Sequence, residues 1–334
     1  MSSDEKANVS RRRLSIMRRL EFCCYAGALV LLGTWLLWTR SYGRIPEPIL
    51  PPAGEVIPQS APFTFAIMGD NRGHMGTVTD ILHRAQADQA RVILHVGDLA
   101  ETCSEREYDW LLETIHKAKL SVPFCAVPGN HDLASKTAPP DERCRFYERA
   151  FGQRCYWFAL GDALFVALDN STGVFSADDL RWLDDTLGRL RGQFPLCFVV
   201  MHEPIRDPRP GNAHSMGKEG GDALAAMFKK YHVSAMFTGH IHAFLEGNVE
   251  GVPVYITGGA GATLYEPERV HHYALCHVNA DGSFSVEKKA VPNHGGEYVE
   301  RLFRLGYSPD VGLGVAVALL FTGLLLRKRS QARG

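Results

Sequence analysis

Short apolar runs alternate with amphipathic segments through the middle of this chain. Seven runs are rich in β-branched and aromatic residues and are bounded by Gly, Pro or Asn, as buried strands are. They cover residues 63–68, 91–96, 122–127, 163–168, 195–201, 233–238 and 252–257. Between them, helical periodicity occupies roughly residues 76–88, 105–119, 141–150, 177–191 and 219–231. Strands that alternate with helices predict an α/β sandwich.

Two longer apolar segments lie near the ends of the chain. Residues 22–39 and residues 311–326 carry no charged side chain, and basic residues flank both segments. Both are slightly shorter than the ~20 residues that span a bilayer, but flanking arginines can extend them toward the headgroups. We therefore expect one N-terminal and one C-terminal transmembrane helix. A buried core helix is the alternative for the second segment.

Charge is distributed unevenly along the chain, although the formal net charge is only −1. Residues 1–19 carry six basic and two acidic side chains, and residues 327–334 carry four basic ones and no acid. The remainder therefore holds 26 basic and 35 acidic side chains. This acidic middle part lacks the excess of basic side chains that binds the phosphates of nucleic acid. We therefore expect no nucleic-acid partner.

The basic ends also predict an orientation. Both termini should be cytoplasmic, with residues 41–310 on the periplasmic or other extracytoplasmic side of a membrane. Arg11, Arg12 and Arg13 resemble a twin-arginine export signal only loosely, and no small-residue cleavage site follows them. An uncleaved membrane anchor is the better interpretation.

These features divide the chain into seven predicted segments. They are a basic cytoplasmic N-terminus (1–21), a transmembrane helix (22–39), a Pro-rich linker (40–62), a globular domain (63–292), a juxtamembrane segment (293–310), a transmembrane helix (311–326) and a basic cytoplasmic tail (327–334). An exported domain permits disulfides, and Cys144 and Cys155 are the nearest pair in that domain. The sequence does not fix their connectivity.

Five short motifs place metal-binding side chains at the ends of predicted strands. They read Gly69-Asp70-Asn71-Arg72, Gly97-Asp98-Leu99, Gly129-Asn130-His131-Asp132, Met201-His202-Glu203-Pro204 and Gly239-His240-Ile241-His242. Open α/β sheets gather functional loops at the carboxyl ends of their strands, so the motifs should meet at one edge. Carboxylates, an amide and imidazoles, with no thiolate, suit a divalent ion such as Mn, Fe or Zn.

The ordered set of motifs resembles the calcineurin-like metallophosphoesterases, which are binuclear-metal hydrolases of phosphate esters. The resemblance covers about residues 63–290 and implies that family's fold, a β-sandwich flanked by helices. It also implies that two divalent ions are held by Asp70, Asp98, Asn130, His202, His240 and His242. Asp98 would bridge both ions, Asp70 and His242 would belong to the first ion, and the other three residues to the second. Two ions ~3.5–4 Å apart clamp a phosphate and activate water as a hydroxide nucleophile at neutral pH.

Two further residues are expected to act on the substrate. By the resemblance, His131 stands beside the metals and donates a proton to the leaving group or stabilises charge. Arg72 replaces a metal-binding histidine of many family members, and its planar fork suits phosphate oxygens. A salt bridge to a nearby carboxylate is the alternative for Arg72, and water or His74 is a candidate for the open ligand position. Asp132 would orient His131 or cap a turn.

The resemblance predicts a phosphomonoesterase or phosphodiesterase that acts at the outer face of the membrane. A tether beside the bilayer would bring a lipid-linked phosphate or pyrophosphate within reach of the site. One alternative is a catalytically silent, membrane-anchored binding or sensor module, which the six remaining ligands and the intact His131 disfavour. A nuclease is another alternative, and the acidic middle part disfavours it. His95, inside a predicted strand, is interpreted as a core histidine or one that supports the metal ligands.

Overall fold

The computed structural model describes residues 3–41, 52–135, 138–211, 214–265, 269–292 and 309–331. The chain forms two compact units, one made of Met1–Ile45 with Val299–Gly334 and the other of Pro46–Tyr298. Parts of five predicted segments lie outside the described residues, namely 1–2 of the N-terminus, 42–51 of the linker, 136–137, 212–213 and 266–268 of the globular domain, 293–308 of the juxtamembrane segment and 332–334 of the tail.

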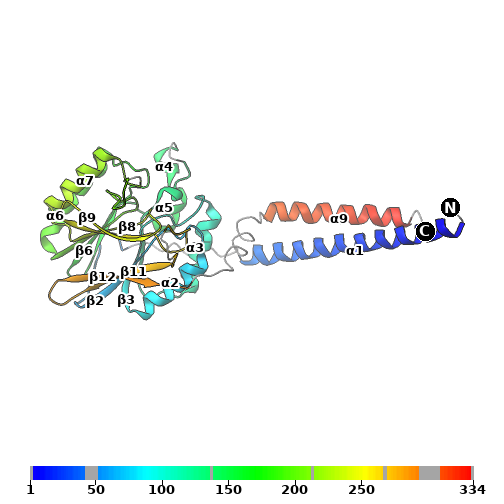
Figure 1. Ribbon diagram of the computed structural model, residues 1–334, viewed down its shortest axis with the longest axis horizontal. Helices are drawn as coiled ribbons and strands as arrows, with labels where there is room; N and C mark the ends of the chain where they lie inside the picture. The colour runs from blue at the N-terminus through cyan, green and yellow to red at the C-terminus, as the bar shows by residue number, and fades with distance from the viewer. Residues whose placement is uncertain are drawn as a thin grey trace. The chain divides into compact units, whose positions relative to one another are not determined.

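The second unit is a sandwich of two β-sheets with helices on its outer faces (Figure 1). The first sheet has the order β1 (Val56–Ile57), β5 (Tyr156–Leu160), β6 (Ala163–Ala167), β7 (Leu196–Val200), β8 (Ala235–Thr238), β10 (Val252–Thr257) and β9 (Phe244–Val249). The second has the order β12 (Phe284–Ala290), β11 (His272–Val278), β2 (Phe63–Met68), β3 (Ala90–His95) and β4 (Phe124–Ala126). The predicted α/β sandwich is confirmed.

Aromatic side chains fill the space between the two sheets. The ring of Phe65 on β2 lies 5.0 Å from that of Phe165 on β6, 5.2 Å from Phe198 on β7 and 5.6 Å from Phe237 on β8, measured between centroids. All four side chains are fully buried. Burial of a phenyl side chain contributes roughly 1.5–3 kcal/mol. This cluster therefore holds the two sheets together and aligns their edges.

Helices cover both outer faces of the sandwich. They are α2 (Met75–Ala87), α3 (Glu105–Lys117), α4 (Pro140–Arg143), α5 (Arg145–Phe151), α6 (Ala177–Leu190) and α7 (Lys218–Lys230), with short 3-10 turns η1 (Asn130–Asp132) and η2 (Arg191–Gln193). A capping box starts α6, since the Ser176 hydroxyl accepts from the Asp179 N–H at 3.1 Å and the Asp179 carboxylate accepts from the Ser176 N–H at 2.9 Å. Leu183, Leu187 and Leu190 then face the sheet at helical spacing.

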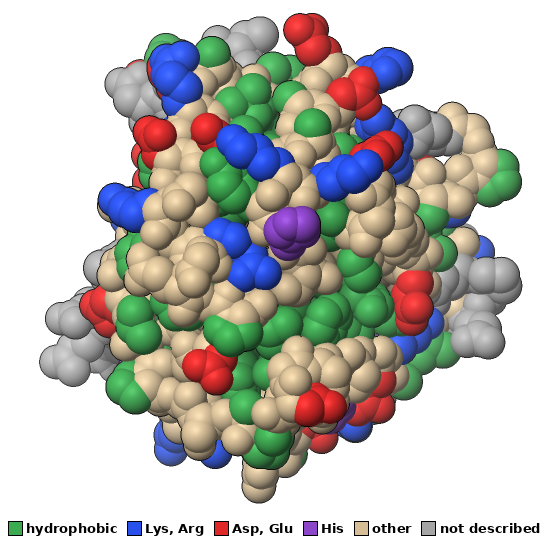
Figure 2. All heavy atoms as spheres, turned by 90° about the vertical axis from the view of Figure 1, so that its left-hand side faces the viewer, with side chains coloured by type: hydrophobic (Ala, Val, Ile, Leu, Met, Phe, Trp, Pro, Cys, Tyr) green, Lys and Arg blue, Asp and Glu red, His purple; other side chains and the backbone are tan. Residues whose placement is uncertain are grey.

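Charged side chains on this unit are mixed in sign. On the face drawn in Figure 2, Lys and Arg side chains are interspersed with Asp and Glu. Ion pairs also join neighbouring helices, as where Lys230 of α7 lies 2.8 Å from the Asp184 carboxylate of α6. Such exposed pairs contribute little to stability.

The sequence analysis missed five strands: β1, β5, β9, β11 and β12. β9 and β12 lie at the edges of the two sheets, and many of their residues are at least partly exposed. Their sequences are therefore polar and do not form the continuous apolar runs that mark a buried strand. All eight cysteines are free thiols, and burial raises the pKa of Cys144 to about 12.

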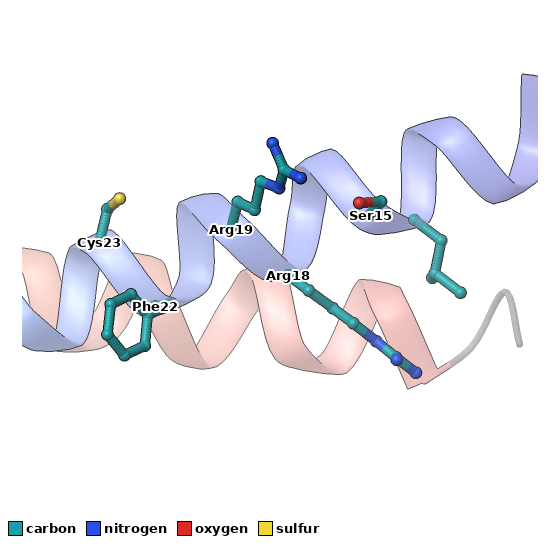
Figure 3. Close-up of a pocket in the computed structure, with 6 residues that line it drawn as sticks. Ser15, Arg18, Arg19, Phe22 and Cys23 are labelled. Atoms are coloured by element: carbon teal, nitrogen blue, oxygen red, sulfur yellow. The ribbon is translucent and has the colours of Figure 1, made fainter.

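The first unit contains two helices that pack side by side, α1 (Ser3–Ser41) and α9 (Pro309–Gln331). A Cβ on Gly323 would lie 2.8 Å from Cε1 of Tyr25, so glycine allows this close approach. Along α1, a pocket is lined by Leu14, Ser15, Arg18, Arg19, Phe22 and Cys23 (Figure 3). Guanidinium groups and apolar side chains therefore share this stretch of α1.

The prediction of two transmembrane helices is wrong. Within the described residues, no helix combines the length and the apolar character that crossing a bilayer requires. The apolar segments are 18 and 16 residues long, whereas a span takes ~20, and each continues into arginine-rich turns of the same helix. The predicted membrane localisation, with the globular domain on the periplasmic or extracytoplasmic side, depended on these helices and is corrected with them.

Candidate metal centre

The five sequence motifs follow strands whose carboxyl ends meet at one edge of the sandwich. β2, β3 and β4 are parallel neighbours in one sheet, and β7 and β8 are parallel neighbours in the other. Backbone hydrogen bonds connect the loops that follow these strands. The Asp70 N–H donates to the Gly97 carbonyl at 2.9 Å, the Arg72 N–H to the Asp98 carbonyl at 3.1 Å, and the Gly239 N–H to the His202 carbonyl at 3.0 Å. The motifs therefore form one connected site.

Four residues of these motifs have left-handed backbone conformations. The φ angles are 59° at Asp70, 44° at Arg72, 57° at Asp98 and 66° at His240. A side chain in this region costs on the order of 1–3 kcal/mol and persists only where surrounding contacts enforce it. Such strain clusters at functional sites, and here it occurs in three loops that carry candidate ligands.

Buried carboxylates and an imidazole lie at the centre of the site. Asp70, Asp98 and His202 each bring one ligand atom into a group whose atoms all lie within 4.8 Å of one another. Asp70 and His202 are fully buried, and Asp98 is 2% exposed. Two buried carboxylates at this separation require positive charge. The donor set therefore fits a divalent metal ion.

Two more predicted ligands converge on the same place. The Asn130 Oδ1 atom lies 3.1 Å from His202 Nε2 and 2.9 Å from His240 Nδ1. His202 Nε2 is also 3.3 Å from Asp98 Oδ1. The ligand atoms predicted for the second ion are thus all within hydrogen-bonding distance of a neighbour. Burial and the nearby His202 lower the pKa of His240 to about 3, so its ring is neutral.

Backbone carbonyls set the tautomers of His202 and His242. His202 Nδ1 donates to the Val96 carbonyl and His242 Nδ1 to the Thr263 carbonyl, both at 2.8 Å. In each neutral ring the Nε2 lone pair then faces a carboxylate, at 3.3 Å from Asp98 and 3.5 Å from Asp70. Burial lowers the pKa of both rings, but the carboxylates outweigh it and the net shift is upward. A metal ion at Nε2 would displace the proton that this shift favours.

His131 is oriented by the loop that follows β3. Its backbone N–H donates to Asp98 Oδ1 at 2.9 Å, and its Nδ1 donates to the Glu101 carbonyl at 2.8 Å. Arg72 Nη2 lies 2.5 Å from Glu101 Oε1 and 3.3 Å from His131 Nδ1. Because Nδ1 carries the hydrogen that the Glu101 carbonyl accepts, Arg72 and His131 do not hydrogen-bond there. The alternative interpretation of Arg72, a salt bridge, is what the structure contains.

Asp132 orients the loops and not the His131 ring. Its buried carboxylate accepts hydrogen bonds from four donors: the N–H groups of Leu99, Ala100 and Gly129 and the hydroxyl of Tyr108, at 2.8–3.1 Å. The bond from Gly129 caps η1. Burial, reinforced by Asp98, raises the pKa of Asp132, and the donors oppose that rise.

Buried polar side chains connect the ligand loops to each other. His95 Nδ1 accepts from the Gly97 N–H at 3.2 Å, and its Nε2 donates to Asn71 Oδ1 at 2.8 Å. Asn71 Nδ2 in turn donates to the Leu99 carbonyl at 2.9 Å. Burial lowers the pKa of His95 to about 3, so the ring stays neutral. This series of hydrogen bonds joins the Asp70 loop to the Asp98 loop.

Asn170 and Glu101 are two functional residues that the sequence analysis did not assign. Asn170 Oδ1 accepts from the N–H groups of His202 and Glu203 at 2.9 and 3.0 Å, and its Nδ2 donates to the Glu203 carbonyl at 2.7 Å. Asn170 lies two residues after the predicted strand 163–168, and Glu101 follows Asp98 by three residues. Position after a strand was the only available signal for either residue.

Aromatic rings form one rim of the site. The ring of Tyr265, whose side chain is 57% exposed, stacks on His242 with centroids 5.0 Å apart. His214 lies 5.6 Å from the His240 ring and 6.5 Å from the Tyr265 ring. His74, the candidate for the open ligand position, precedes α2, and the described cluster of Asp70, Asp98 and His202 does not include it.

The chain matches one protein family and is similar in sequence to proteins of known name. The family "Calcineurin-like phosphoesterase" matches residues 63–244. A probable cyclic nucleotide phosphodiesterase of Fibrobacter succinogenes is 27% identical over 169 residues, which are 48% of this chain and 61% of that protein. The chain thus spans about three fifths of that relative's length.

Solved structures share the fold. A purple acid phosphatase from yellow lupin seeds superposes with a TM-score of 0.57 at 16% identity, over 70% of this chain and 52% of that one. A dimetal phosphatase from Danio rerio gives a TM-score of 0.53 at 15% identity, over 69% of this chain and 96% of that one. At such identities the likeness concerns the fold alone.

Proposed function

Because the chain belongs to the calcineurin-like phosphoesterase family and is thus a hydrolase of phosphoric ester bonds, we propose that it cleaves phosphomonoesters or phosphodiesters at a centre for two divalent ions. The proposed ligands are Asp70, Asp98, Asn130, His202, His240 and His242. The observation that carries the proposal is the convergence of two buried carboxylates and His202 within 4.8 Å. Carboxylate, amide and imidazole donors suit Mn, Fe or Zn.

Divalent ions bound here supply Lewis acidity toward the phosphate and a nucleophilic water at neutral pH. The protein's own residues orient the substrate and move the proton. His131 in its imidazolium form gives the Nε2 proton to the leaving oxygen, while Nδ1 stays bonded to the Glu101 carbonyl. Arg72 holds phosphate oxygens with N–H groups that Glu101 leaves free.

The substrate class is a phosphate ester. Proteins similar to the chain include a probable cyclic nucleotide phosphodiesterase and a phosphoenolpyruvate phosphatase of Allium cepa, so both monoesters and diesters remain in the proposal. The predicted lipid-linked substrate depended on a membrane tether and is not part of it. A polar rim with an exposed tyrosine, Tyr265, is compatible with either ester class.

The test is a hydrolysis assay with para-nitrophenyl phosphate and its bis ester. The full chain is stripped with a chelator and reloaded with Mn, Fe or Zn. We expect metal-dependent turnover that Asn130→Ala and His240→Ala abolish. His277→Ala is the matched control, because His277 lies on β11 and pairs with the exposed Glu287 at 2.9 Å.

Activity that survives Asn130→Ala and His240→Ala would contradict the proposed site. Metal and phosphate binding without turnover, under every metal, would identify the silent binding module instead.

A further inference from the structure

We infer that the two metal positions are unequal: the position of Asp70 and His242 holds an exchangeable ion, because Arg72 replaces a ligand there with a fixed positive charge. The position of Asn130, His202 and His240 holds its ion tightly. This inference rests on the two-ion centre of the proposed function. It goes beyond that function by assigning each position a different affinity and by naming the residue responsible.

The two sets of ligand atoms differ in number and in spacing. At the tight position, Asn130 Oδ1 lies within 3.1 Å of both His202 Nε2 and His240 Nδ1, and His202 Nε2 is 3.3 Å from Asp98 Oδ1. The other position has two ligands of its own, Asp70 and His242, with 3.5 Å between Asp70 Oδ1 and His242 Nε2. Counting the shared Asp98, the positions have four and three protein ligands.

Charge acts in the same direction as ligand number. The Arg72 backbone N–H donates to the Asp98 carbonyl, which fixes this residue beside the bridging carboxylate. Its guanidinium lies among the ligand loops, with Nη2 3.3 Å from His131 Nδ1, and the His131 N–H donates to Asp98 Oδ1. A divalent ion held by Asp98 and the ligands of the first position is repelled by this positive charge, because guanidinium does not lose its proton in proteins.

Glu101 holds the guanidinium in place. Its Oε1 atom lies 2.5 Å from Arg72 Nη2, with 20% of the Arg72 side chain exposed. The Glu101 backbone N–H donates to Glu107 Oε1 at 2.7 Å, which anchors this loop to the start of α3. The ion pair and this anchor together fix where the guanidinium lies.

One donor of Arg72 points to the role that replaces metal ligation. Among the described residues, Arg72 Nε is buried and has no hydrogen-bond partner. A buried N–H without an acceptor is costly, and an oxygen of a bound phosphate would satisfy it. Arg72 therefore supplies the substrate with positive charge that a tightly bound first ion would otherwise provide.

The test measures metal stoichiometry in the full chain and needs no substrate. Chelator-stripped protein is titrated with Mn²⁺ in a calorimeter, and metal retained after desalting is counted by mass spectrometry. We expect one retained ion per wild-type chain and a second whose Kd is at least about tenfold weaker. Arg72→His adds an imidazole and removes the fixed charge, so two ions should be retained.

Two further variants separate the causes and guard against misfolding. Arg72→Lys keeps the charge and should retain one ion, as the wild-type chain does, whereas Arg72→Gln removes the charge and should tighten the second ion. The inference is overturned if the wild-type chain retains two ions of equal affinity, or if Arg72→His and Arg72→Gln both leave the second ion as weak as in wild type. Either result leaves the proposed function standing; a chain that binds no divalent ion would overturn the proposed function itself.

Discussion

Three histidine side chains in this centre are held in place through one ring nitrogen, Nδ1. His202 and His242 use Nδ1 to bind backbone carbonyls, and His131 does the same with the Glu101 carbonyl. In His202 and His242, Nε2 faces a carboxylate of the site. The same contact, a hydrogen bond from Nδ1 to a backbone carbonyl, thus sets the tautomer of two candidate ligands and of the candidate proton donor.

Asp98→Asn tests the bridging carboxylate. The asparagine Oδ1 atom can still accept from the His131 N–H, which Asp98 does now at 2.9 Å, so the loop should keep its shape. In the proposed centre Asp98 is shared by both ions, so the amide would weaken both positions, and we expect kcat/KM to fall at least about a hundredfold with loss of bound metal. Metal analysis and phosphatase kinetics measure both effects. Full metal content in Asp98→Asn would exclude a bridging role.

His95 predicts a pH dependence of stability. Its folded pKa, about 3, is below the ordinary value of 6.5, so the unfolded chain binds more protons and stability is lost as pH falls below about 6.5. Between pH 7 and pH 5 this loss is about 2 kcal/mol. His95→Gln keeps the donor to Asn71 and should remove that part of the pH dependence. Urea titrations at both pH values measure it; parallel losses in wild type and variant would contradict the prediction.

At the residue scale, the sequence predicted which residues belong to the site better than it predicted which side chains contact each other. Asp70, Asp98, Asn130, His202, His240 and His242 were named from motifs, and the structure brings them to one edge of the sandwich. The pairing of Arg72 with Glu101 was not predicted as the leading interpretation. Which of two partners a guanidinium takes depends on rotamers and on a loop 29 residues away, and local pattern carries neither.

Loops at strand ends are the elements that bring the ligands together. The structure packs these loops so closely that Gly129 has no room for a side chain: a Cβ there would lie 2.3 Å from both the backbone N and Oδ1 of Asp98. The loops after β3 and β4 can therefore pack this closely only because residue 129 is glycine.

Gly129→Ala should displace Asp98 and lower kcat/KM by about a hundredfold or more, because backbone atoms must move to admit the methyl group. Gly192→Ala is the matched control, since a Cβ at Gly192 meets nothing within 4 Å. Steady-state kinetics of both variants, with circular dichroism as a check on folding, measures the effect. Equal activity of the two variants would show that the loop contact is dispensable.

Asn170 makes a similar connection for the β7 loop through its side chain. Asn170→Ala removes three hydrogen bonds to His202 and Glu203 and leaves buried backbone groups unpaired, at a cost of roughly 1–3 kcal/mol for each. We expect about 10- to 100-fold weaker metal binding, as is typical when a residue that orients a ligand is removed. Calorimetric titration with Mn²⁺ measures it. Unchanged affinity would show that other contacts suffice to place His202.

Continuous apolar runs made most of the buried strands predictable, although the interior strands β5 and β11 were missed, and the polar edge strands β9 and β12 gave no such signal. The predicted strands 63–68 and 252–257 coincide with β2 and β10, because continuous apolar runs leave little ambiguity. β12 alternates partly buried and exposed residues and includes Glu287, Lys288 and Lys289, so it resembles a polar loop in sequence. Pairing with β11 fixes it as a strand, and that contact is visible only in the folded chain.

At the scale of the whole molecule, the chain separates into a catalytic sandwich and a helical unit. The transmembrane prediction failed because apolar composition was judged over segments of 18 and 16 residues, apart from the helices that contain them. In the structure, α1 and α9 pack against each other, and α1 carries guanidinium groups next to its apolar stretch. Helix length and helix pairing are properties of the folded chain, so a local hydropathy pattern cannot supply them.

The division into units predicts that catalysis survives removal of the helices. Every proposed ligand, His131 and Arg72 lie in the unit Pro46–Tyr298, together with both sheets and the aromatic cluster between them. A chain of residues 46–298 should therefore bind the same number of metal ions as the full chain and keep kcat/KM toward para-nitrophenyl phosphate within about threefold. The same truncated chain with Asp98→Asn gives the inactive reference. If the truncated chain folds, as judged by circular dichroism, and yet loses metal or activity, the helical unit contributes directly to the centre.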